Sequence, residues 1–195
     1  MPAHFKLIKK IIFLACLWPL VRLVWLGFNE DLGANPIEFV ERSTGYWALF
    51  FLMISLSLTP FRFITKIFWP IQLRRMLGLY MFFYAVLHLI TYLYLDYGFD
   101  WYEIKKDIVK HPYVIVGLMA FMLTMPLAIT STNRMIKKLG ARWKKIHQSV
   151  YLIAILGVTH FWWLVKKDIR EPVIFAVVLI VLLGIRIYFK QRKKV

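Results

Sequence analysis

Apolar residues occur in six long runs that are separated by shorter polar or charged segments. The runs cover residues 8–28, 46–61, 76–95, 112–129, 146–165 and 172–189. A helix needs about 20 residues to cross a hydrocarbon layer about 30 Å thick. Backbone groups in lipid must be hydrogen-bonded within the protein, so each run is predicted to be a helix. The pattern therefore predicts an all-α integral membrane protein, a six-helix bundle with short connections that forms a single domain over residues 1–195.

Acidic residues are confined to alternate connections along the chain. All ten acidic residues follow the first, third or fifth run. The N-terminal segment, the second and fourth connections and the C-terminal tail, in which we count Arg186, carry basic residues and no acidic ones. Because basic segments stay on the cytoplasmic side, both termini are predicted to be cytoplasmic. The first run is too long for a signal peptide and contains Arg22, so we expect it to remain as a helix.

The composition agrees with a membrane protein and excludes several other classes. Apolar residues make up 61% of the chain, and the formal net charge is +16. Topology explains this charge, so nucleic acid is not an expected partner, whereas membrane lipid is. A single cysteine cannot form an intrachain disulfide or a thiolate metal cluster. The sequence has no phosphate-binding loop, no nucleophile elbow and no apparent internal repeat.

Few ionisable side chains lie inside the apolar runs, and such residues are candidates for a functional site. They are Arg22, His88 and His160, with His147 at the inner edge of the fifth run. The third and fifth runs have the same predicted direction, so the depths of their histidines can be compared. At about 1.5 Å per residue, His88 and His160 lie roughly 8 to 10 Å inside the outer boundary. The two imidazoles are therefore predicted to lie at the same depth.

Two imidazoles at one depth on facing helices can bind one iron from opposite sides, as in bis-histidine b-type haem. Gly157 lies one turn before His160 and would let a flat ring approach the helix. The alternative is that each histidine only forms a hydrogen bond across a helix pair. Two histidines at equal depth beside a glycine favour haem, so His88 and His160 are the predicted ligands.

At the level predicted to be near the cytoplasm, the sequence offers one histidine and no histidine partner for it. His147 is about 20 Å from His160 along a helix, so the two would not share an iron. A second haem with His147 would need a partner on the third run, where Arg74 and Arg75 stand instead. Arginine does not ligate iron, but it suits a haem propionate or a flavin phosphate. The alternative is that both arginines only follow the positive-inside rule.

Three stretches resemble the MsrQ family, formerly YedZ, of the ferric-reductase-like transmembrane domain group. They are LGANPIEFVERSTGYWALFFLMISLSLTPFR, RRMLGLYMFFYAVLHLITYLYLD and AITSTNRMIKKLGARWKKIHQSVYLIAILGVTH. The resemblance covers essentially the whole chain, so residues 1–195 are expected to be one such haem-binding domain. It implies that His88, His147 and His160 are the haem-associated histidines. In the wider group, oxidases often carry two histidines on each of two helices, and this chain lacks the inner one on its third run.

The resemblance also implies a function. Family members are haem-bearing subunits in the bacterial inner membrane, with FMN as a further cofactor. They take electrons from quinone or a cytoplasmic flavin reductase and deliver them to a periplasmic molybdopterin enzyme, the MsrP-like subunit that reduces methionine sulfoxide. The chain is thus expected to be an electron-transfer subunit that is not itself catalytic. Electrons would enter near Arg74 and pass through haem b between His88 and His160, with a second haem as an open alternative.

Two other functions are compatible with a six-helix bundle. A proton-coupled transporter could use the histidines as a relay, but it would be expected to hold carboxylates inside the membrane. Here all ten acidic residues lie between the runs. A cofactor-free membrane anchor subunit is the other alternative, and it would show no visible absorption.

Overall fold

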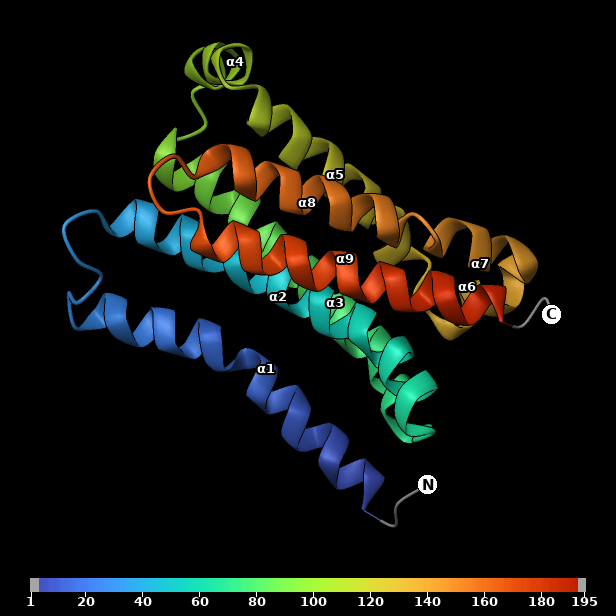
Figure 1. Ribbon diagram of the computed structural model, residues 1–195. Helices are drawn as coiled ribbons and strands as arrows, with labels where there is room; N and C mark the ends of the chain where they lie inside the picture. The colour runs from blue at the N-terminus through green and yellow to red at the C-terminus, as the bar shows by residue number, and fades with distance from the viewer. Residues whose placement is uncertain (1–3, 193–195) are drawn as a thin grey trace.

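The computed structural model describes residues 4–192, and every regular element in that range is helical. This confirms the all-α prediction. Along the chain (Figure 1) the elements are α1 (Phe5–Phe28), α2 (Pro36–Thr65), the 3-10 helix η1 (Trp69–Leu73), α3 (Arg74–Ile90), the π-helix η2 (Thr91–Asp96), α4 (Trp101–Lys110), α5 (Pro112–Ile129), α6 (Asn133–Leu139), α7 (Ala141–His147), α8 (Val150–Leu164) and α9 (Arg170–Gln191).

Within residues 4–192, five helical segments are long and apolar enough to cross a membrane. They are α1, α2, the continuous segment Trp69–Asp96, α5 and α9. The fifth predicted run instead forms α8, which has 15 residues and a length of about 22 Å. A turn at Gln148 and Ser149 separates α8 from α7 and shortens the helix. The bundle thus holds five helices of spanning length, with α8 packed against α5 and α9.

The connections contain more structure than the sequence pattern indicates. A short helix, α4, follows the third run, and two more, α6 and α7, precede α8. The Asp100 side chain caps α4 by accepting hydrogen bonds from the main-chain N–H groups of Tyr102 and Glu103. On α4, Ile104 is buried while Tyr102 and Val109 are exposed. The third and fourth connections, which were predicted only to be short, therefore contain helices of their own.

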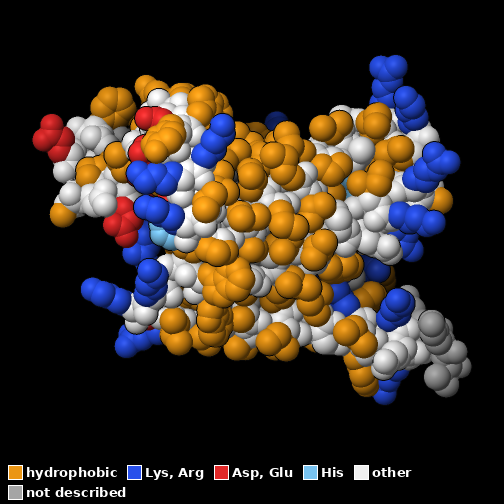
Figure 2. Space-filling model, turned by 90° about the horizontal axis from the view of Figure 1, so that it is seen from above, with side chains coloured by type: hydrophobic (Ala, Val, Ile, Leu, Met, Phe, Trp, Pro, Cys, Tyr) orange, Lys and Arg blue, Asp and Glu red, His pale blue; other side chains and the backbone are white. Residues whose placement is uncertain are grey.

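Two pairs of helices form the centre of the bundle. Helix α2 packs along α3, and α5 packs along α8, while α9 contacts both α2 and α8. The first helix begins and the last helix ends at the same end of the bundle (Figure 1). The face seen in Figure 2 carries acidic side chains only at the opposite end, whereas Lys and Arg side chains cover the end that holds the termini. The acidic residues of alternate connections thus lie at one end, where Lys and Arg side chains also stand, while the end with the termini carries only basic charge on this face (Figure 2).

Helix α1 lies at the edge of the bundle and bends near Pro19, which stands inside the helix (Figure 1). The Tyr84 hydroxyl accepts a hydrogen bond from the Leu20 N–H (3.2 Å) and donates one to the Cys16 carbonyl (2.9 Å). In a regular helix these two main-chain groups would bond to each other. Tyr84, which is fully buried, therefore completes the backbone hydrogen bonding beside the proline and attaches α1 to α3.

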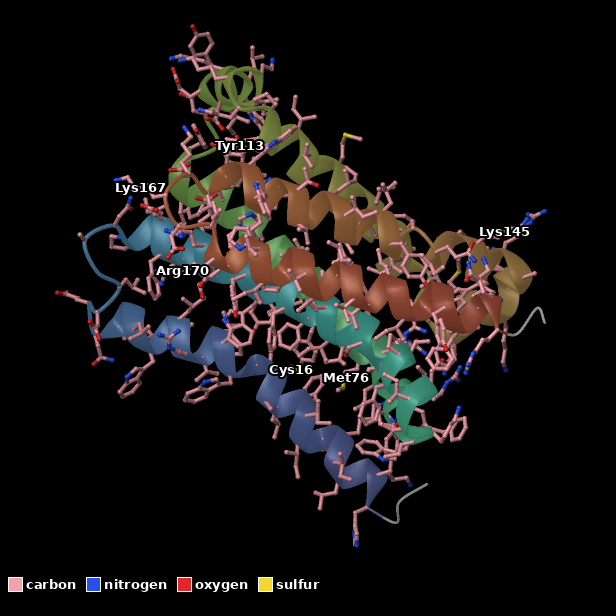
Figure 3. The ribbon with its side chains drawn as sticks, in the orientation of Figure 1. Cys16, Met76, Tyr113, Lys145, Lys167 and Arg170 are labelled. Carbon is pink, nitrogen blue, oxygen red and sulfur yellow. The ribbon has the colours of Figure 1, made fainter. Side chains whose placement is uncertain are left out.

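Replacing Tyr84 by phenylalanine is expected to loosen α1. The change removes both hydrogen bonds, and leaving such buried groups unpaired costs about 1 to 3 kcal/mol. Cys16, the single cysteine, is buried against the same contact (Figure 3). We expect Cys16 in Tyr84→Phe to react with a maleimide about tenfold faster than in the unaltered protein, as a loss of about 1.4 kcal/mol implies. Tyr94→Phe, at an exposed tyrosine, is the control, and equal rates in both variants would contradict this role.

Candidate functional site

The rings of His88 on α3 and His160 on α8 lie side by side. Their centroids are 6.2 Å apart and their planes are inclined by 74°. The two histidines are therefore neighbours, as their predicted common depth requires. A metal–imidazole bond is about 2 Å long, and the ring nitrogen is roughly 1 Å from the ring centre, so two imidazoles on opposite sides of one metal have centroids roughly 6 Å apart. The observed separation therefore suits two ligands of one iron.

Both rings are held by the same kind of hydrogen bond. His88 Nδ1 lies 3.0 Å from the Glu41 carbonyl on α2, and His160 Nδ1 lies 2.7 Å from the Tyr113 carbonyl on α5. A carbonyl only accepts, so in each ring Nδ1 carries the proton and Nε2 has a free lone pair. Neither Nε2 forms a hydrogen bond with any residue in the range 4–192. Histidines that bind metal usually have their second nitrogen fixed in this way.

Two glycines give these rings room against the neighbouring helices. A Cβ added at Gly117 would lie 2.7 Å from His160 Nδ1, and one added at Gly45 would lie 3.1 Å from His88 Cε1. Each glycine stands four residues after the residue whose carbonyl holds the histidine. The ring therefore packs where the next helical turn has no side chain. The sequence reasoning missed both glycines, because they are distant in sequence from the histidines that they admit.

Gly157 lies against α2, and its role beside a flat ring stays a prediction. An added Cβ there would meet the Leu49 side chain at 3.4 Å. This glycine thus brings α8 close to α2, and a leucine side chain lies against it.

The histidine site consists of two similar halves. In both halves 47 residues separate the carbonyl acceptor from the histidine, and the glycine holds the same place. One half is the pair α2 and α3, and the other is the pair α5 and α8. The expectation that the chain has no internal repeat is therefore wrong for the site: a carbonyl, a glycine and a histidine recur in the same order. The repeat escapes inspection because few of the residues around these three are identical.

His147 lies on α7, away from the histidine pair. Tyr113, whose carbonyl holds His160, and Lys145, close to His147 in sequence, are at opposite ends of the bundle (Figure 3). The His147 ring stacks on Trp143 with a centroid distance of 3.9 Å, and Nδ1 donates to the Trp143 carbonyl. The main chain of Leu127 also lies near the ring, yet the buried Nε2 has no hydrogen-bond partner in the described chain. His147 Nε2 thus differs from the Nε2 atoms of the other two histidines, because it is buried beside the Leu127 main chain.

The two arginines that the sequence singles out do not act as a pair. Arg75 is exposed, and its guanidinium donates a hydrogen bond to the Asn133 side chain on α6. Arg74 is partly buried, and its Nε has no hydrogen-bond partner in the described part of the chain. Only Arg74 therefore faces the interior of the bundle.

A further arginine, Arg186 on α9, was missed as an interior residue. Its guanidinium donates hydrogen bonds to the Tyr151 hydroxyl (2.7 Å) and the Leu56 carbonyl. It also lies 5.3 Å from the Tyr151 ring centroid. We had counted Arg186 with the basic tail, although it falls inside the sixth apolar run. A charge within an apolar run was the signal that could have identified it.

A polar cluster lies at the opposite end, around α4. Asp107 accepts hydrogen bonds from the Tyr92 hydroxyl (2.9 Å) and from His111 Nδ1 (2.7 Å). Burial favours a raised pKa for the Asp107 carboxyl, but hydrogen bonds from Tyr92, His111 and Tyr97 outweigh it and hold the pKa below its ordinary value. The ionised carboxylate therefore ties α4 to η2 and to the start of α5.

Comparison with known proteins agrees with this arrangement. Residues 44–158 match the family described as "Ferric reductase like transmembrane component". That range includes His88 and His147 and ends just before His160.

Curated relatives match the chain over nearly its full length. A protein of Herminiimonas arsenicoxydans is 48% identical, over 99% of this chain and 90% of its own length. Proteins of Ralstonia nicotianae (45%, over 98% and 89%) and Rhodospirillum rubrum (47%, over 97% and 91%) are similar. Each is named "Protein-methionine-sulfoxide reductase heme-binding subunit MsrQ". With this identity and coverage, the chain belongs to the MsrQ family of ferric-reductase-like transmembrane proteins.

Proposed function

We propose that the chain is the membrane electron-transfer subunit of a methionine sulfoxide reductase system. It resides in the bacterial inner membrane, crosses it six times and has both termini in the cytoplasm. It receives electrons from quinone or a cytoplasmic flavin reductase and passes them to a periplasmic, molybdopterin-containing catalytic subunit that repairs oxidised methionines. The names of the relatives and the charge difference between the two ends of the bundle support this assignment.

The observation that carries the proposal is the histidine pair with its two free Nε2 atoms. We assign His88 and His160 as the residues that would hold a b-type haem between α3 and α8. Such a haem, when bound, accepts and releases one electron at a time. The carbonyls of Glu41 and Tyr113 orient the rings and increase the basicity of Nε2, which strengthens a bond to iron.

The inner half of the bundle has fewer groups to offer a cofactor. His147 is our candidate ligand for a second haem, because its buried Nε2 is free. FMN is implied by family resemblance, with Arg74 and Arg75 at the cytoplasmic end as candidate contacts. Arg75 would have to leave Asn133 to take part, so Arg74 is the better candidate of the two.

Absorption spectra of the purified protein test the assignment of the pair. With haem b between two histidines, reduction by dithionite should sharpen the Soret band and split the visible bands. We expect His88→Ala and His160→Ala each to abolish this signal, since either change removes one axial ligand. His147→Ala should retain part of it.

Two results would contradict this assignment. A colourless protein from haem-replete cells would contradict haem binding and would favour the alternative that the chain is a cofactor-free membrane anchor subunit. A His147→Ala variant that loses all haem while His160→Ala keeps it would mean that the ligands have been paired wrongly.

Glycine substitutions test the same site without removing a ligand. Gly117→Ala would bring a Cβ to 2.7 Å from the His160 ring, so the ring must move from its position. Gly45→Ala is milder at 3.1 Å, and Gly78→Ala on α3 meets nothing within 4 Å. We expect the haem bound per protein to fall by more than half in Gly117→Ala and less in Gly45→Ala, and to stay unchanged in Gly78→Ala. Equal haem content in all three variants would show that the ring positions do not matter.

A further inference from the structure

Positive charge is concentrated inside the half of the bundle opposite the acidic residues. Arg74 and Arg186 contact neighbouring residues of α2, since the Ser55 hydroxyl donates to the Arg74 carbonyl and the Arg186 guanidinium donates to the Leu56 carbonyl. The charges of Arg186 and Arg62 both act on Arg74. No ion pair to a carboxylate is formed by any of these three arginines within residues 4–192. Partly buried like charges repel one another and lose hydration, which is costly unless an anion compensates. Among the described residues, these three arginines therefore have no negatively charged partner.

Unpaired polar atoms gather in the same region. The buried side-chain nitrogens and oxygens without a hydrogen-bond partner, in the part of the chain that is described, are Arg74 Nε, Arg186 Nε, His147 Nε2 and Thr59 Oγ1. Arg74 is within electrostatic range of both Arg186 and His147. Thr59 follows Leu56, the carbonyl partner of Arg186, by less than one helical turn. Buried polar groups are normally paired, so a cluster of unpaired ones indicates a ligand site.

We propose that Arg74 and Arg186 together bind an anionic oxygen group, a carboxylate or a phosphate, carried by a cofactor in this half of the bundle. The inference rests on the proposed function for the two sources it considers, a porphyrin propionate and a flavin phosphate. Arg186 is a positioned partner, because Tyr151 and the Leu56 carbonyl hold two of its nitrogens and leave Nε free. Arg74 has no such protein partner for its side chain among the described residues.

The chemistry of the donor set supports an anion over a neutral ligand. A guanidinium offers five N–H donors and no acceptor, and its fork matches the paired oxygens of a carboxylate or phosphate. Two guanidiniums from different helices, α3 and α9, would approach the same anion from two sides. Bound in this way, the anion would offset their repulsion and link the last helix to the centre of the bundle.

Binding of charged and neutral analogues tests the proposal. The haem arm compares haem with its dimethyl ester, measured by absorption of the reconstituted protein. The flavin arm compares FMN with riboflavin, measured by fluorescence quenching. In the unaltered protein the anionic member of at least one pair should bind more tightly. In Arg186→Gln and in Arg74→Gln that preference should shrink by about 10- to 100-fold, the scale of a lost charge-assisted hydrogen bond.

Arg192→Gln is the matched control, since Arg192 is an exposed arginine beyond the end of α9 and lies over the Tyr188 ring. It should keep the full preference. Arg74→Gln is expected to fold normally, because the Arg74 side chain has no hydrogen-bonded protein partner to lose among the described residues. It therefore separates loss of anion binding from loss of structure. The arm in which the preference disappears identifies the source of the anion.

The inference is overturned if Arg74→Gln and Arg186→Gln both keep the full preference for the anionic ligand in both arms. This holds even if Arg186→Gln lowers thermal stability. The signal of the His88 and His160 haem separates this failure from that of the proposed function. If that signal persists while the preference does not depend on the arginines, only the anion site is wrong. If the unaltered protein binds neither haem nor FMN, the proposed function fails and the anion site fails with it.

Discussion

The site depends on two hydrogen bonds, each from a histidine Nδ1 to a main-chain carbonyl on the neighbouring helix. In a medium without water an unpaired N–H is costly, so the hydrogen bond to the carbonyl fixes each ring. Because Nδ1 carries the proton of this hydrogen bond, Nε2 is unprotonated in both rings. Nε2 is therefore the nitrogen able to bind a metal. The contact is close enough that a Cβ one turn further along the accepting helix would lie against the ring, at 2.7 Å for Gly117 and 3.1 Å for Gly45. The positions of Gly45 and Gly117 thus follow from the hydrogen bonds.

The two ends of the bundle differ in the groups that they offer to a cofactor. At the end that carries the acidic residues, the chain provides two equivalent histidines, one from α3 and one from α8. At the other end the two helix pairs are no longer equivalent. The position as far before His88 as His147 is before His160 holds Arg75 and not a histidine. Arg75 turns outward to Asn133, and the interior is occupied by Arg74 and Arg186. One end therefore carries the histidine pair that we propose as iron ligands, and the other combines one histidine with unneutralised positive charge.

The sequence predicted what hydrophobic periodicity and helix length determine. The all-helical fold, the closeness of His88 and His160, and the confinement of acidic residues to one end follow from runs of apolar residues and from counting along helices. Features that depend on contacts between distant segments were not predictable in this way. Gly45 and Gly117 are distant in sequence from their histidines, and Tyr84 bonds to the backbone of α1. Arg186 was missed because a basic residue near a cytoplasmic terminus satisfies the positive-inside rule without further explanation.

The most direct test of the central claim is the position of iron in a crystal of the haem-loaded protein, located by anomalous scattering at the iron edge. The account predicts a peak between the His88 and His160 rings, about 2 Å from each Nε2. An iron peak bound to only one of these histidines, or to neither, would contradict it.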